Sequence, residues 1–127
     1  IDNLAFNGAT TPAIPVVPTT VAPVQRTAAS VSGTAKIGKT LTVSKGSWTG
    51  TPTPTYSYKW YRCTVSGSTA KTTAPTSSLK CVAVAGKTST TYKLAAADKG
   101  KYIRAFVTVK NSKGTKYSLT KTTAKVS

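Results

Sequence analysis

The side chains that could carry acid–base, nucleophilic or metal chemistry are scarce in this chain. Among its 127 residues there are 18 Lys and Arg, two acids and no His. General acid–base catalysis needs a carboxylate, an imidazole or a similar group tuned in a cleft, and beyond residue 26 the one acid is Asp98. No Ser-His-Asp or Cys-His set can be assembled from this inventory. The sequence therefore predicts a protein that is not an enzyme.

The sequence lacks the ligands of a metal site and the motifs of a nucleotide site. Beyond residue 26, two cysteines and one carboxylate cannot form a four-ligand zinc site, and a calcium loop needs several carboxylates. No P-loop or dinucleotide-binding fingerprint is present, so we expect no cofactor. An intramolecular Lys–Asn crosslink would have to use Asn111, with Asp98 as the buried acid, and we do not expect it.

The charge balance is the strongest functional signal in the composition. A formal net charge of +16 implies self-repulsion, so a polyanionic partner is one expectation and a solvated basic surface is the other. The lysines are dispersed along residues 36–125, which suits diffuse attraction more than base reading. We expect no specific nucleic-acid recognition. Lys113, Lys116 and Lys121 have a further role open to them, because edge lysines discourage sheet-to-sheet aggregation.

The elements that must position these residues read as short β-strands with turn signals between them. The central one is Tyr56–Cys63, whose alternation places Tyr56, Tyr58 and Trp60 on one face. Regular spacing of such strands is typical of an antiparallel β-sandwich, here of about seven strands. The expected core residues are Leu41, Val43, Tyr58, Trp60, Leu94, Ile103 and Val107.

The other predicted elements surround this strand. Residues 64–80 are rich in Ser, Thr and Lys and read as a long exposed loop, and residues 95–100 read as a turn or a single helical turn. The remaining strands are expected at 27–32, 40–44, 81–85, 90–94, 102–110 and 117–126. No stretch is apolar enough to span a membrane.

Residues 1–26 differ from the rest because they carry a Pro-rich run and a single base, Arg26. Proline fixes φ and removes a donor, so this stretch is predicted to be extended, as a linker or as an arm that docks on a neighbouring subunit. A folded domain is then expected over residues 27–127. The missing Met indicates processing or a fragment. The apolar positions of the arm are Ile1, Leu4, Phe6, Ile14, Val16 and Val17.

Six segments carry a resemblance to a known family. They are 33–41 (GTAKIGKTL), 46–48 (GSW), 58–63 (YKWYRC), 91–94 (TYKL), 96–100 (AADKG) and 107–114 (VTVKNSKG). In this order they resemble the immunoglobulin-like modules of bacterial secreted and cell-surface proteins, which often occur in tandem and are common in actinobacteria. The resemblance covers residues 33–126 and implies an immunoglobulin-like sandwich with an extended N-terminal arm.

Two features depart from the vertebrate form of that fold. The disulfide that pins the two sheets across the core Trp is absent, because the earlier strand offers Leu41 and Val43 at those places. Tyr102, which follows Asp98 and Gly100, resembles a tyrosine corner. Strand alternation instead favours Ile103 in the core, so the sequence does not decide whether Tyr102 forms such a corner.

The resemblance also implies a pairing for the two cysteines. Bacterial modules of this type often carry one cysteine after the Trp strand and another before the next short strand, where Cys63 and Cys81 stand. Their bond would enclose 17 residues and stabilise the fold by roughly 3 kcal/mol in the chain-entropy model. It would also tie down the 64–80 loop. Two cysteines in a Thr- and Ser-rich β-domain indicate an oxidising compartment, and hence a secreted or cell-surface protein.

Three functions follow as expectations. The first is a non-enzymatic structural module of a bacterial filament, stalk or envelope layer, which contacts other copies or adjacent domains through the arm. The second is an adhesion module that binds anionic cell-wall polymer or glycan through its lysines, Tyr61 and the 64–80 loop. The third is an immunoglobulin-like decoration on a phage particle.

Overall fold

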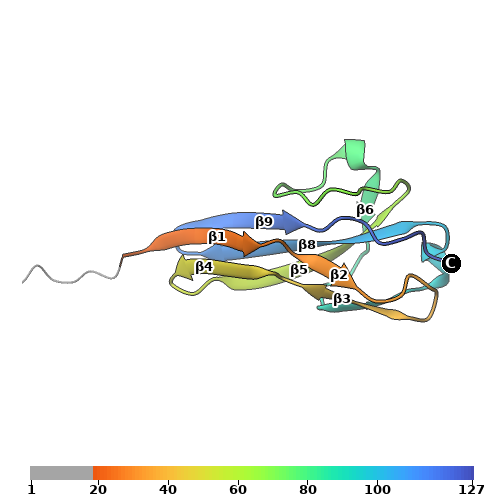
Figure 1. Cartoon of the computed structure of the whole chain (residues 1–127), viewed down its shortest axis with the longest axis horizontal. Coiled ribbons are helices and arrows are strands. Elements are labelled where there is room, and N and C mark those ends of the chain that lie inside the picture. Colours follow the sequence, from red (N-terminus) through yellow and green to blue (C-terminus); the bar gives the residue numbers. More distant parts are fainter. Residues whose placement is uncertain (1–18) are drawn as a thin grey trace, which may run out of the picture.

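The computed structural model describes residues 19–127, which form an antiparallel β-sandwich with nine strands (Figure 1). Two short 3₁₀ helices, η1 (Ser77–Leu79) and η2 (Ala96–Asp98), lie in the connections. Among these residues no helix is long and apolar enough to cross a membrane. The strands are β1 (Val21–Thr27), β2 (Ser30–Ser32), β3 (Thr40–Ser44), β4 (Ser47–Thr51), β5 (Thr55–Cys63), β6 (Cys81–Ala83), β7 (Thr91–Lys93), β8 (Tyr102–Asn111) and β9 (Gly114–Leu119).

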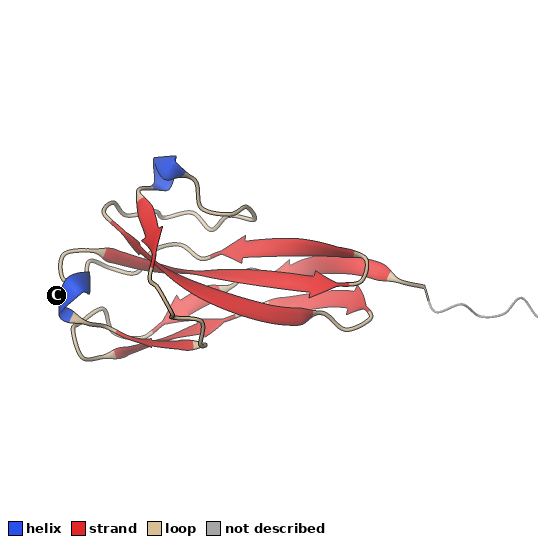
Figure 2. Ribbon diagram, turned by 180° about the vertical axis from the view of Figure 1, so that it is seen from behind, coloured by secondary structure: helices blue, strands red, loops and turns tan. Residues whose placement is uncertain are grey.

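The strands make two layers (Figure 2). One layer is a four-stranded sheet in the order β6-β5-β8-β9, and the other contains the sheet β2-β3-β7. The second layer continues lengthwise as the pair β1-β4, because β1 leads into β2 and β3 leads into β4 (Figure 1). Gly46 stands at the break between β3 and β4 with φ of +76°, and a Cβ there would collide with the Thr27 carbonyl. The break therefore requires glycine.

The core lies between the layers, where strand alternation predicts it. Trp60 of β5 is fully buried, its ring stacks on Tyr92 of β7 at 5.5 Å, and its Nε1 donates to the Ser89 carbonyl at 2.8 Å. Tyr58 is half-buried and packs against the same cluster. Tyr102 is half-exposed while its neighbour is buried, which settles the orientation of this strand in favour of Ile103. The other expected core residues, all buried, are Leu41, Val43, Leu94, Ile103 and Val107.

The folded part begins earlier than the composition suggests. The pattern predicts a first strand from residue 27, whereas β1 begins at Val21 and pairs with β4. Pro23 falls at an irregularity of that ladder, between the register pairs Val21↔Thr51 and Val24↔Thr49. A proline there removes no ladder hydrogen bond, so a Pro-containing segment can still be a strand. The proposed arm residues Ile1, Leu4, Phe6, Ile14, Val16 and Val17 lie outside the described residues.

Candidate binding surface

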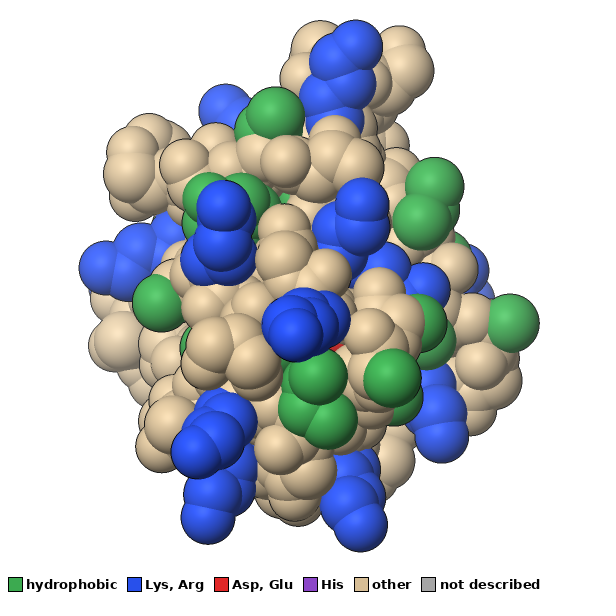
Figure 3. All heavy atoms as spheres, turned by 90° about the vertical axis from the view of Figure 1, so that its right-hand side faces the viewer, with side chains coloured by type: hydrophobic (Ala, Val, Ile, Leu, Met, Phe, Trp, Pro, Cys, Tyr) green, Lys and Arg blue, Asp and Glu red, His purple; other side chains and the backbone are tan. Residues whose placement is uncertain are grey.

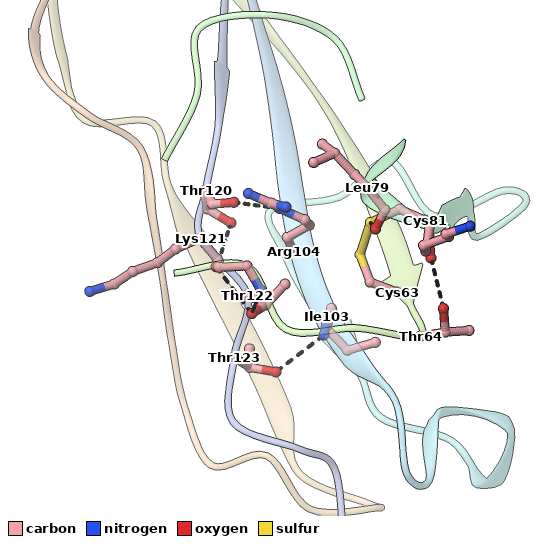
Figure 4. Close-up of a disulfide and its surroundings, with 12 residues drawn as sticks. Cys63, Thr64, Leu79, Cys81, Ile103, Arg104, Thr120, Lys121, Thr122 and Thr123 are labelled. Carbon is pink, nitrogen blue, oxygen red and sulfur yellow. Dashed lines mark hydrogen bonds between the residues drawn. A yellow bond between two sulfur atoms is a disulfide. The ribbon is translucent and has the colours of Figure 1, made fainter. Parts of the chain in front are cut away.

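The disulfide joins neighbouring strands of the four-stranded sheet. Cys63 at the end of β5 and Cys81 at the start of β6 are directly opposite in register, and their Sγ atoms are bonded at 2.03 Å (Figure 4). The predicted disulfide is therefore present. It closes the base of the 64–80 loop, which otherwise contains η1 and one isolated bridge.

The loop does not project freely into solvent, because its backbone folds back onto the sheet. Lys71 and Leu119 exchange two main-chain hydrogen bonds of 2.9 and 2.8 Å. Gly67 and Thr122 form two further bonds of 2.8 Å: the Gly67 N–H donates to the Thr122 hydroxyl oxygen, and the Thr122 N–H donates to the Gly67 carbonyl. Leu119 points to the outer face of the sheet and is nevertheless fully buried. The loop thus has exposed side chains, as predicted, on a backbone that is fixed.

Arg104 is the buried residue that the sequence pattern does not explain. Alternation along β8 places it on the outer face, yet only 1% of its surface is exposed, because the loop covers it. Its Nε donates to the Thr120 carbonyl at 2.7 Å (Figure 4). Its Nη2 donates to the Thr69 carbonyl at 3.0 Å. Burial lowers the pKa of this guanidinium below its ordinary value. Arg104 therefore fastens the loop through carbonyl dipoles, with no carboxylate partner among the described residues.

A substitution at Gly67 tests this fastening. A Cβ on Gly67 would lie 2.7 Å from Nη1 of Arg104, so Gly67→Ala must push the guanidinium aside. We expect Gly67→Ala to lower the free energy of unfolding by about 1–2 kcal/mol, the lower part of the usual range for overpacking, because the group that must move is the end of a side chain. We also expect faster hydrogen exchange at the amides of Lys71 and Leu119. The control is Gly86→Ala, whose Cβ meets nothing within 4 Å but whose φ of +73° strains the backbone. It should lower stability without changing exchange at those two amides.

Three aromatic rings lie in a row on the outer face, from three neighbouring strands. Tyr61 of β5 meets Phe106 of β8 edge to face at 6.2 Å, and Phe106 stacks on Tyr117 of β9 at 5.3 Å. All three are partly exposed. Lys59 is paired with Phe106 in the ladder and shares this face. A surface of flat rings beside cations can bind ligands by stacking and by charge.

Asp98, the one acid among the described residues, has a structural role. Asp98 is fully buried and accepts hydrogen bonds from Arg62 Nε at 2.6 Å, the Tyr92 hydroxyl at 2.7 Å and the Ala95 N–H at 2.8 Å. The predicted turn at residues 95–100 is present as η2, but the ion pair with Arg62 was not predicted. The hydrogen bond to Asp98 raises the pKa of Arg62. With its carboxylate fully engaged, Asp98 holds η2 onto β5 and β7.

Because two tyrosines are at least partly buried, we expect the free energy of unfolding to fall at alkaline pH. Burial raises the pKa of Tyr92, with a further rise from its hydrogen bond to Asp98, and burial followed by repulsion from Tyr56 raises the pKa of Tyr58. The unfolded chain then loses these protons at lower pH than the folded one. The contribution of the two tyrosines to the free energy of unfolding is therefore complete below the ordinary pKa of 10.0. It is lost as pH rises through the pKa values of the folded state.

Urea unfolding at several pH values between about 8 and 11 measures this loss. Tyr58→Phe and Tyr92→Phe should each flatten the decline above the ordinary tyrosine pKa, whatever their stability at neutral pH. Lysine deprotonation also acts in this range, but it acts equally in all variants. The same slope in the wild type and both variants would contradict the assignment.

The basic side chains are dispersed. Figure 3 shows Lys and Arg scattered over the end of the sandwich that carries the C terminus, with no single patch.

Comparison of the chain with protein-family models, with curated proteins and with solved structures finds no match to any of them.

Proposed function

We propose that the chain is a non-enzymatic structural module of an extracellular bacterial assembly, a link in a filament, stalk or envelope layer. One observation supports this most. The start of β1 and the C terminus lie at opposite ends of the long axis of the sandwich (Figure 1). A module with this geometry can contact one neighbour at each end of its long axis. The disulfide and the resemblance to immunoglobulin-like modules agree with this role.

The contact with a neighbour is proposed to use residues 1–18, whose apolar positions include Leu4 and Phe6. Light scattering of residues 1–127 and of residues 19–127 tests this, because the shorter chain keeps β1 intact. The longer chain should associate, and the shorter one should remain monomeric with the same melting temperature. The full chain with Leu4→Asp and Phe6→Asp should behave like the shorter one. Monomers in every case would rule out this contact.

A second role is supported by the aromatic row and the lysines beside it. The surface formed by Tyr61, Phe106 and Tyr117 has the composition of a glycan-binding face, and a net charge of +16 attracts polyanions. We propose binding to anionic wall polymer or glycan. Affinity for polygalacturonate should fall steeply between about 50 mM and about 500 mM salt, since exposed charges are screened. An affinity that does not change with salt would exclude this role.

A further inference from the structure

A hollow at the edge of the sandwich, beside β1 and β9, brings together aromatic, amide and cationic side chains. It has a volume of about 390 Å³ and lies where β1, the ladder partner of β4, contacts β9. This volume is within the range of small-molecule sites, about 300–1,000 Å³. It is lined by Pro23, Val24, Gln25, Trp48, Thr72, Lys116 and Tyr117.

Two aromatic side chains of this lining are held in place by contacts of their own. The Trp48 indole is half-buried, and its Nε1 donates to the Lys45 carbonyl at 2.6 Å. The Tyr117 ring is 36% exposed and is stacked on Phe106 at 5.3 Å. Rings that are already fixed lose little freedom when a ligand settles against them, so they suit a flat, weakly polar ligand face.

Gln25 supplies an unused hydrogen-bond acceptor in the same place. It is paired with Trp48 in the β1–β4 ladder, and its Oε1 is buried with no hydrogen-bond partner among the described residues. Buried polar atoms in folded proteins almost always have a partner, so an exception in a hollow needs an explanation. If the Gln25 side chain turns toward the hollow, a ligand hydroxyl that donates to Oε1 would satisfy it.

Lys116 adds a cation to this lining, and none of the lining side chains is an acid. A ligand that matches all three features has a ring to lie on aromatic faces, a hydroxyl that donates to an amide, and a negative group. We propose that this hollow is a subsite for an acidic sugar residue, a pyranose bearing a carboxylate, within a glycan. The inference rests on the second role above and names the residues that would give it specificity.

Calorimetry with trigalacturonate, at salt high enough to screen diffuse attraction, tests the site directly. Gln25→Leu removes the acceptor and should weaken binding ~10-fold, as expected for one lost hydrogen bond to a ligand. Lys116→Ala should weaken binding by a similar factor, whereas Lys93→Ala, which removes the same charge from an exposed position of β7, should leave it within about twofold. The neutral galactose trisaccharide should bind at least ~10-fold more weakly than the acidic one.

Thermal melting controls for folding in this experiment. Gln25→Leu should melt no lower than the wild type, because the Oε1 atom that it removes makes no hydrogen bond. Lys116 is exposed, so Lys116→Ala remains an independent test if Gln25→Leu fails to fold.

The outcomes separate this site from general polyanion binding. If polygalacturonate binds but Gln25→Leu and Lys116→Ala behave like Lys93→Ala, the subsite is wrong and diffuse binding stands. If polyphosphate competes as well as trigalacturonate, charge alone is being read and the subsite is again wrong. If trigalacturonate binds with the expected variant effects while polygalacturonate does not bind, the site stands and the polymer-binding role fails. No binding of trigalacturonate at millimolar concentration overturns the proposal.

Discussion

Replacing Cys63 and Cys81 with serine is expected to lower the free energy of unfolding by about 3 kcal/mol. The bond closes a segment with a sequence separation of 18, and its loss frees that segment mainly in the unfolded chain. The folded loop keeps its main-chain bonds from Lys71 to Leu119 and its contact with Arg104. Unfolding should therefore stay cooperative, at a lower urea midpoint.

Equilibrium urea unfolding followed by tryptophan fluorescence measures this change, since Trp60 is buried and reports on the core. The wild type after reduction should match the double serine variant. Exchange at the Lys71 amide should rise in both. A double variant with the wild-type midpoint would show that the loop is held by Arg104 and the β9 contacts alone, and that the crosslink adds nothing measurable.

The parts of the fold that the sequence predicts best are those where the pattern is local. The alternation of Tyr58 and Trp60 along β5, and of Ile103 and Val107 along β8, places these residues in the core because side chains of a strand point alternately to its two faces. The strands that the pattern missed are β1 and β4, and they pair with each other. Pro23 weakens the strand signal of β1 and Gly50 weakens that of β4. The two strands become recognisable only through their pairing with each other.

The candidate surface is predicted less well, because it depends on contacts between distant residues. Tyr61 could be named in advance as an outward-facing aromatic of β5, but its neighbours Phe106 and Tyr117 come from other strands, and their stacking depends on register. Arg104 offers no sequence signal of burial, since the cover comes from a loop that precedes it by about 35 positions. The hollow beside Gln25 and Trp48 needs the β1–β4 pair, so it could not be found before β1 was known.

Replacing Arg62 with alanine is expected to lower the free energy of unfolding by about 3 kcal/mol, the lower end of the cost of breaking a buried ion pair. Asp98 is fully buried and would keep its charge with only the Tyr92 hydroxyl and the Ala95 N–H as donors. The Arg62 side chain is 25% exposed, so part of its interaction is screened and the upper end of the range is not expected.

The two partners should respond unequally because their exposures differ. After Asp98→Asn, Arg62 can turn toward water and η2 keeps a side chain of the same shape, so this loss should be smaller than that from Arg62→Ala. Lys59→Ala removes an exposed cation from the same strand and should change stability by less than about 0.5 kcal/mol. In urea unfolding at neutral pH, the double variant Arg62→Ala with Asp98→Asn should lose less than the sum of the two single variants, since each removes the same ion pair. Additive losses would show that Asp98 acts through η2 alone. An Arg62→Ala variant as stable as Lys59→Ala would mean that the buried carboxylate needs no cation, because the hydroxyl and the backbone N–H hold its charge.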